Sequence, residues 1–257
     1  CQRFTRAAKC RDRDARGGRG LDFRSQRCVI GDEPDLVDAL ALLAAWFVLW
    51  LPLAFNPFDR SDWLLENALL IAAIALLAAT WRPFPLSRTS YTLIFVFLCL
   101  HTIGAHFTYA EVPYDAWSRQ TLGLPIDALF GWERNNFDRV VHFSYGLLLA
   151  YPIRELFLRV AAVKGFWGYF LPLDLTMSSS ALYEIIEWAA AVVFGGDLGA
   201  AFLGTQGDPW DAQKDMALAS LGALIAMCVT AAVNYHYQRD FAREWQESLR
   251  VKRRAPL

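Results

Sequence analysis

The sequence predicts an all-α protein, a polytopic transmembrane helical bundle of about six spans. Of its 257 residues, 55% are hydrophobic, whereas soluble domains hold roughly 45–50% apolar residues. Six stretches are long enough to cross the hydrocarbon core, which takes roughly 20 helical residues. The lysines and arginines between these stretches are unevenly distributed, and this asymmetry predicts the orientation of the chain.

The six predicted spans follow one another through short connections. In chain order they are residues 36–55, 63–81, 91–108, 140–160, 166–194 and 215–237. The fourth and fifth carry charged residues, so their hydropathy signal is weaker than that of the others. No linker is long enough to separate two domains. We therefore expect a single transmembrane domain over residues 35–238.

Two basic segments flank this predicted domain. Residues 1–34 contain nine lysines and arginines without apolar periodicity, so we expect either a disordered segment or an artefact of an assumed start site that lies upstream of the true one. Residues 239–257 are expected to form a basic cytoplasmic tail. The net charge of the whole chain is −1, which gives no reason to expect a nucleic-acid partner.

The positive-inside rule predicts that both termini lie in the cytoplasm (N-in/C-in). With this orientation, the cytoplasmic segments hold 20 lysines and arginines and the external segments hold 5. Without residues 1–34 the ratio is 11 to 5, so its sign does not depend on them. Loops 56–62, 109–139 and 195–214 then lie outside, which in a bacterium would be the periplasmic or extracellular side.

Acidic and histidine residues are predicted to gather at the external ends of four spans. Asp138 and His142 are four residues apart, and Glu184 and Glu187 are three apart, so each pair shares one helix face. An ionised aspartate at the bilayer centre costs roughly 2.5–3.5 kcal/mol, and less near the interface. A cluster of such groups therefore needs protons, basic partners or a bound cation.

The favoured hypothesis is a divalent-metal site, because carboxylates with an imidazole suit Mn, Zn, Fe or Mg. The candidate ligands are Asp138, His142, Glu184, Glu187, Asp211 and Asp215. Residues expected near them, in the surrounding shell or in ligand binding, are His106, Tyr109, Glu111 and Asp208. A metal here could polarise a phosphoryl oxygen or activate water, which suggests chemistry on an envelope lipid, a polymer precursor or a small molecule.

Two other readings stay open. The cluster could belong to a proton- or ion-coupled transporter, since ionisable groups in spans often mark ion pathways. It could also be a structural ion-pair network of a non-catalytic membrane scaffold, in which the carboxylates bond Arg134, Arg139 and Lys214. Taken singly, an aspartate such as Asp211 could merely complement a helix dipole. Glu66 could pair with Arg60 near the outer face.

Four motifs in this order carry a resemblance to a known family. They are "GAHFTYAEVP", "NNFDRVVHFSYG", "ALYEIIEWAAA" and "FLGTQGDPWDAQKDM". They resemble the YjdF-like family of bacterial inner-membrane proteins, over residues 60–235. That family is one of unknown function, so the resemblance implies fold and location and no catalytic assignment. A fainter likeness to VanZ-like proteins hints at cell-envelope chemistry.

Overall fold

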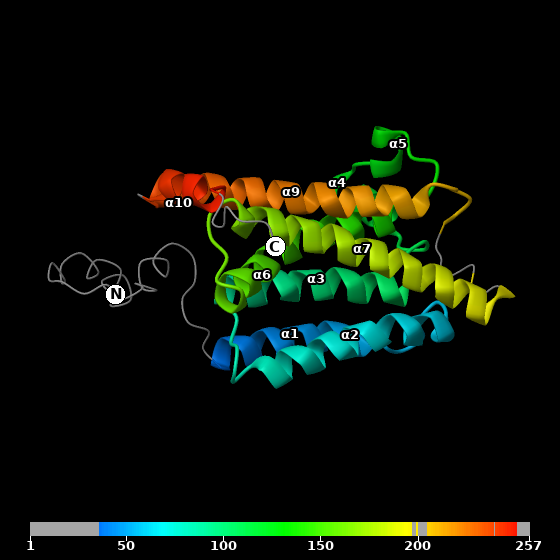
Figure 1. Ribbon diagram of the computed structural model, residues 1–257. Coiled ribbons are helices and arrows are strands. Elements are labelled where there is room, and N and C mark those ends of the chain that lie inside the picture. The colour runs from blue at the N-terminus through cyan, green and yellow to red at the C-terminus, as the bar shows by residue number, and fades with distance from the viewer. Residues whose placement is uncertain (1–35, 197–198, 200–204, 239, 251–257) are drawn as a thin grey trace, which may run out of the picture. The chain divides into compact units, whose positions relative to one another are not determined.

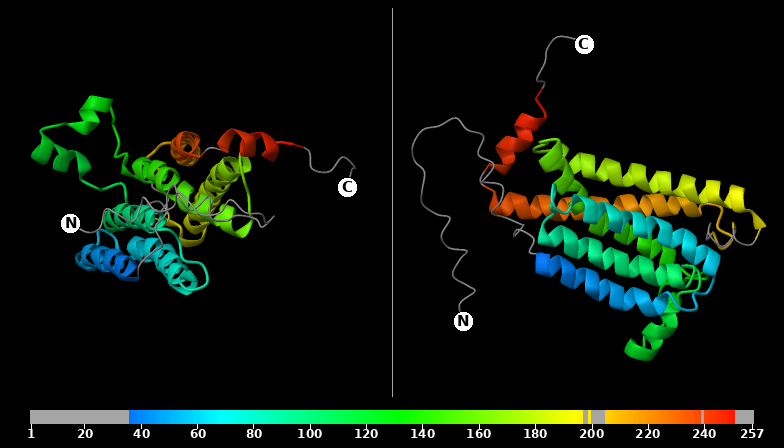
Figure 2. Two further views of the ribbon diagram at one scale, coloured as in Figure 1. Left: turned by 90° about the vertical axis from the view of Figure 1, so that its left-hand side faces the viewer. Right: turned by 90° about the horizontal axis from the view of Figure 1, so that it is seen from below.

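The structure is a computed structural model that describes residues 36–196, 199, 205–238 and 240–250. All regular elements in these residues are α-helices, as the sequence predicted, and successive long helices run in alternating directions (Figures 1 and 2). The helices are α1 (Leu36–Leu53), α2 (Arg60–Thr80), α3 (Arg88–His106), α4 (Tyr114–Leu122), α5 (Ile126–Phe130), α6 (Phe137–Val160), α7 (Trp167–Phe194), α9 (Asp211–Tyr237) and α10 (Phe241–Ser248). The predicted basic segment 1–34 and the last residues of the predicted tail lie outside the described residues.

Four of the described helices are long and apolar enough to cross a membrane, namely α1, α2, α3 and α9. Helices α6 and α7 are also long, with 24 and 28 residues, but they are not among these four. By length and composition the structure thus supports four of the six predicted spans. The two remaining spans and the orientation stay predictions.

Several helices begin about one turn before the apolar run that predicted them, because their first turns are polar. Helix α2 illustrates the reason. The Asp59 carboxylate accepts hydrogen bonds from the backbone N–H groups of Ser61 (2.7 Å) and Asp62 (2.9 Å), which caps the helix N-terminus. Hydropathy alone placed the start of this span at residue 63, so Asp62 fell in the predicted loop although it lies within the helix.

The predicted external loop 109–139 contains two short helices, α4 and α5. Gly123 and Gly131 end them with φ angles of 69° and 66°, the left-handed conformation that glycine adopts readily. Tyr114 then donates a 2.6 Å hydrogen bond to Asp127, which ties the two helices together. Helices α1, α3 and α7 end, and helices α2, α6 and α9 begin, at this end of the bundle, which we call the α4–α5 end.

Helix α6 occupies the centre of the bundle and packs against α3, α7 and α9 (Figure 2). Its closest partner is α9, and small residues make this approach possible. A Cβ atom on Gly146 would lie 1.8 Å from the Ala219 carbonyl oxygen, and one on Gly222 would lie 2.2 Å from the Phe143 carbonyl oxygen. The two helix backbones are therefore in direct contact, which fixes their relative depth and brings their polar first turns to one level.

The opposite end of the bundle is held by α10 and by Glu155 of α6. Ser248 of α10 accepts a 3.0 Å hydrogen bond at Oγ from the backbone N–H of Phe166, and its carbonyl accepts one from the Trp167 indole, also 3.0 Å. Glu155 accepts a 2.6 Å hydrogen bond from the Ser90 hydroxyl near the start of α3. These contacts close the turns that join the long helices at this end.

Candidate functional site

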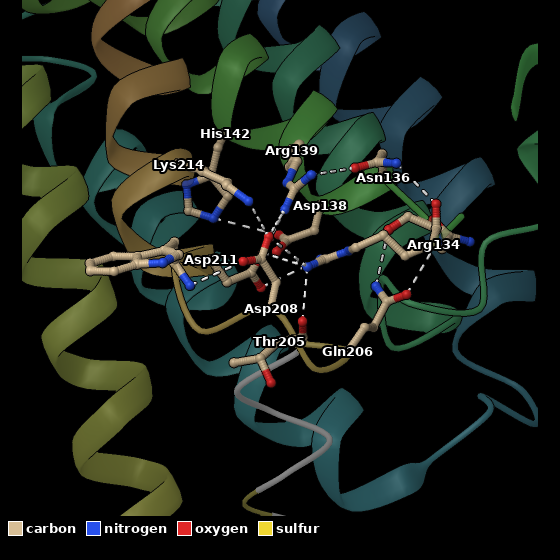
Figure 3. A network of polar contacts seen from close by, with 12 residues as sticks. Arg134, Asn136, Asp138, Arg139, His142, Thr205, Gln206, Asp208, Asp211 and Lys214 are labelled. Carbon is tan, nitrogen blue, oxygen red and sulfur yellow. Dashed lines mark hydrogen bonds and ion pairs between the residues drawn. The ribbon is translucent and has the colours of Figure 1, made fainter. Parts of the chain in front are cut away.

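Five charged side chains at the α4–α5 end form an ion-pair network that joins two loops (Figure 3). Arg134, in the segment before α6, donates a 2.6 Å hydrogen bond to Asp211. Arg139 of α6 donates to Asp208 (2.5 Å) and to Asp211 (3.3 Å). Lys214 of α9 donates to Asp208 at 2.5 Å. This is the arrangement that the scaffold hypothesis predicted for Asp208 and Asp211.

The network holds the chain segments before α6 and α9 side by side. Gln206 adds two uncharged hydrogen bonds, accepting from the Asn135 N–H at 3.2 Å and donating to its carbonyl at 3.0 Å. The hydrogen bond from Lys214, with further donors at Trp210 and Arg139, lowers the pKa of Asp208 to about 2, because these donors favour the charged carboxylate. Asp208 is thus fully ionised near neutral pH.

Directly beside this network lies a second group, Asp138, His142 and Asp215, which we call the histidine cluster. One ligand atom from each residue lies within 4.8 Å of the others. His142 Nε2 is 3.5 Å from Asp138 Oδ1, one helical turn away on α6. Asp215 comes from α9, is 2% exposed, and its Oδ1 accepts no hydrogen bond from the described residues. The α6–α9 contact brings these groups together.

Helix α7 supplies two carboxylates to the same region. Glu184 Oε1 lies 3.6 Å from His142 Nε2, and both side chains are 9% exposed. Glu184 Oε1 accepts no hydrogen bond within the described part of the chain. Glu187 is also 9% exposed and lines a cavity next to the cluster. His142 thus lies between carboxylates of α6 and α7.

The sequence-predicted ligands therefore divide into two groups with different surroundings. Asp211 is engaged by two arginines, so its negative charge is already balanced within the chain. Asp138, His142, Asp215 and Glu184 face one another instead, without an arginine or lysine hydrogen bond to Asp215 or Glu184 among the described residues. Carboxylate and imidazole donors in this mixture suit a borderline divalent metal, so the histidine cluster fits a cation better than Asp211 does.

The other predicted site residues lie at the same end of the bundle but have different partners. His106 donates a 2.7 Å hydrogen bond to the Leu53 carbonyl and so ties the end of α3 to the end of α1. Glu111 is exposed. Tyr109 lines the cavity and makes a 2.5 Å hydrogen bond to His101 Nδ1. Of His106, Tyr109 and Glu111, only Tyr109 lines the cavity.

A cavity of about 280 Å³ opens between α2, α3, α6 and α7. Its lining includes Asp138, His142 and Glu187 from the sequence prediction, and two acidic residues that the prediction did not include, Asp62 and Glu66 of α2. Asp62 is 1% exposed and Glu66 is 3% exposed. Neither Asp62 carboxylate oxygen accepts a hydrogen bond from the described residues.

Glu66 and Arg60, which the sequence suggested as a pair, have other partners in the structure. Arg60 donates to the Ala54 carbonyl at 2.8 Å and lies over the Trp63 ring, whereas Glu66 points into the cavity, where Tyr183 is its hydroxyl donor at 3.4 Å. Asp62 and Glu66 are four residues apart, the same spacing as Asp138 and His142. Applying the shared-face argument to α2 would have found them.

The fold and this site describe a helical membrane protein with buried acidic groups at one end of its bundle, and comparison with known proteins agrees. Residues 39–236 match the family of predicted membrane proteins DUF2238. The chain belongs to this family. It is 39% identical over 185 residues to the inner membrane protein YjdF of Escherichia coli strain K12, covering 71% of this chain and 84% of that relative.

These similarities confirm the predicted family and the predicted location, the bacterial inner membrane. The fainter likeness to VanZ-like proteins is not shown by these comparisons. No solved structure matches the chain significantly. The matches therefore assign no reaction, and the function has to be argued from the geometry of the site.

Proposed function

We propose that the chain is a six-span inner-membrane protein with both termini in the cytoplasm, whose histidine cluster binds a divalent cation at the extracytoplasmic end. Helices α6 and α7 complete the six spans, in a transmembrane domain over residues 35–238. The basic segments 1–34 and 239–257 then flank it on the cytoplasmic side. The α4–α5 end faces outward.

The distribution of lysines and arginines supports this orientation. The segments that the orientation places outside hold 5 of them, and the segments that it places in the cytoplasm hold 11 even without residues 1–34. The positive-inside rule counts these residues and assigns the richer side to the cytoplasm. Ion pairing does not distinguish the two ends, because Arg119 is paired with Asp115 at one end and Arg88 with Asp38 at the other, both at 2.6 Å.

The observation that carries the metal proposal is the buried carboxylate of Asp215. One of its oxygens has no hydrogen-bond partner among the described residues, and the carboxylate lies beside Asp138 and His142. A buried carboxylate without a partner is strongly unfavourable. A cation among the three groups removes this penalty and the repulsion between the two aspartates. Glu184, close to His142, can serve as a further ligand, and Glu187 faces the cavity beside it.

The cavity gives such a cation access to a ligand. A divalent cation polarises a phosphoryl oxygen or makes bound water acidic. Glu187, which lines the cavity beside the cluster, can accept a proton there. We therefore propose a reaction on an envelope lipid or polymer precursor, with hydrolysis or transfer at a phosphoryl group as its class.

Elemental analysis of the purified protein tests the cation. We expect about one bound divalent ion per wild-type chain and loss of that ion in Asp215→Asn and in Glu184→Gln. The matched control is Asp115→Asn, which removes a carboxylate of the outer helices and should keep the ion. A wild-type protein without metal, or an Asp215→Asn variant that binds as much metal as wild type, would overturn the proposal, provided that thermal melting shows both to be folded.

The scaffold function is a second candidate for part of the site, because the ion-pair network itself supports it. Asp208 and Asp211 are bonded to basic residues, and they would be expected to stabilise the loops rather than to bind a ligand. The transporter hypothesis has weaker support. Toward the middle of the bundle the described lining of the cavity has no charged side chain and consists of residues such as Leu70, Leu149 and Ser180, so the buried carboxylates do not continue toward the other end.

A further inference from the structure

The cavity between α2, α3, α6 and α7 has one polar half and one apolar half. At the α4–α5 end it is lined by Asp62 and Glu66 of α2, which face Asp138 and Glu187 from α6 and α7. Further along the helices, the described lining residues carry no charge and are mostly apolar. They include Leu69, Leu70, Phe97, Leu98 and Leu149, beside the hydroxyl groups of Tyr145, Ser179 and Ser180. A ligand that fills this space needs a polar head and an apolar chain.

The apolar half opens to the side of the bundle rather than to its end. Leu69 lines the cavity and is nevertheless 43% exposed, and Ala73, one turn further along α2, is also exposed. Helix α2 packs mainly against α3, and it is not among the closely packed neighbours of α7. If α2 spans the membrane, this opening meets the hydrocarbon chains of the bilayer.

The polar half lacks a positive charge. Asp62, Glu66, Asp138 and Glu187 line it, and neither lysine nor arginine is among the lining residues that the structure describes. Asp62 has the strongest need of a partner, because it is 1% exposed and neither of its carboxylate oxygens accepts a hydrogen bond from the described residues. A buried carboxylate that stays ionised needs a charged or hydrogen-bonding partner, and a ligand with a positive charge can supply it here.

We propose that this cavity binds a bilayer lipid whose head group carries an ammonium. The ammonium donates hydrogen bonds to Asp62 and Glu66, and one hydrocarbon chain passes Leu69 toward the bilayer. The ring of Tyr183, whose hydroxyl already reaches Glu66 at 3.4 Å, offers an aromatic face to the cation. The proposal does not depend on the metal, since Asp62 and Glu66 are not part of the histidine cluster.

Native mass spectrometry with defined lipids tests this inference. The protein is purified in a neutral detergent and offered phosphatidylethanolamine, or phosphatidylglycerol with the same acyl chains, which has no ammonium. We expect one phosphatidylethanolamine per wild-type chain and little phosphatidylglycerol. Asp62→Asn with Glu66→Gln should weaken phosphatidylethanolamine binding about 10- to 100-fold, as loss of charge-assisted hydrogen bonds does. Asp115→Asn is the control and should bind as wild type.

A second variant keeps the test informative if the acidic substitutions disturb folding. Leu69→Trp leaves every charge in place and fills the lateral opening, so it should also reduce phosphatidylethanolamine binding. Equal binding of the two lipids, or undiminished binding by both variants, would overturn the proposal. So would a thermal shift with ethanolamine alone that equals the shift with the lipid, because the ligand would then be a water-soluble amine.

The metal content of the same variants separates this inference from the proposed cation site. Asp62→Asn with Glu66→Gln should retain the metal that wild type binds and lose the lipid. If that variant loses the metal and keeps the lipid, Asp62 and Glu66 serve the cation and the lipid proposal is wrong. If wild type binds lipid but no metal, the cation proposal fails while the lipid proposal stands.

Discussion

Arg134 donates a 2.6 Å hydrogen bond to Asp211, and this pair joins the segment before α6 to the first residue of α9. The Asp211 side chain is 4% exposed and that of Arg134 is 15% exposed, so the pair is better shielded from solvent than an ordinary surface salt bridge. Removing one partner of a buried pair leaves the other charge unbalanced. The pair therefore contributes to the stability of the α4–α5 end.

We predict that Asp211→Asn lowers the free energy of unfolding by about 1–3 kcal/mol, because Arg134 then loses its charged acceptor. Adding Arg134→Gln should restore part of this loss, since no unpaired charge remains. Thermal melting in detergent of the two single variants and the double variant measures the coupling. Strictly additive effects would contradict a direct pairing.

A pH dependence follows from Asp208, whose pKa is lowered to about 2, first by the hydrogen bond from Lys214. In the unfolded chain an aspartate has a pKa of about 3.9. The folded value is the lower one, so the ion pairs of Asp208 stabilise the protein above about pH 4, and this stabilisation is lost as the pH falls toward 2. The difference in melting temperature between wild type and Asp208→Asn should be independent of pH above about pH 4 and should shrink as the pH falls below 4. A difference that disappears already near pH 6 would assign the effect to another group.

Gly222 tests the close contact between α6 and α9. A side chain added there would meet the Phe143 carbonyl oxygen, which is backbone and cannot rotate away. We expect Gly222→Leu to destabilise the bundle by about 3 kcal/mol, at the upper end of the range for overpacking, and to lower the yield of folded protein. Leu221→Ala is the matched control, because Leu221 is next in the chain and 46% exposed. Equal melting temperatures for the two variants would exclude direct backbone contact.

The orientation can be tested by labelling single cysteines in a chain whose native cysteines have been replaced. Glu111 lies at the α4–α5 end and Gln246 lies on α10, and both are exposed. A maleimide that cannot cross the membrane should label Glu111→Cys in intact spheroplasts, and should label Gln246→Cys only after lysis. The reverse pattern would place the α4–α5 end in the cytoplasm.

Much of the fold could be predicted because the relevant signals are local. Apolar runs located the long helices, and the four-residue spacing of Asp138 and His142 placed both residues on one helix face, whatever packs against it. The starts of the helices were predicted less well. The capping aspartate Asp59 and the polar first turn of α2 have no hydropathy signal, and Asp62 was therefore assigned to a loop.

The division of the site into two groups could not be predicted, because it depends on tertiary contacts. Asp211 and Asp215 are both acidic and one turn apart on the same helix. Only the arrangement of α6 beside α9 determines that Asp211 meets Arg134 whereas Asp215 meets His142. Likewise, no sequence pattern shows that His106 is used to hold the Leu53 carbonyl.

Helix α10 has a consequence for the order in which the protein is assembled. Ser248 provides the acceptors for the Phe166 amide and the Trp167 indole in the turn between α6 and α7. A ribosome synthesises Ser248 after all six long helices, so this turn acquires its partners last. A chain that is cut short before α10 would therefore leave the Phe166 amide and the Trp167 indole without these acceptors.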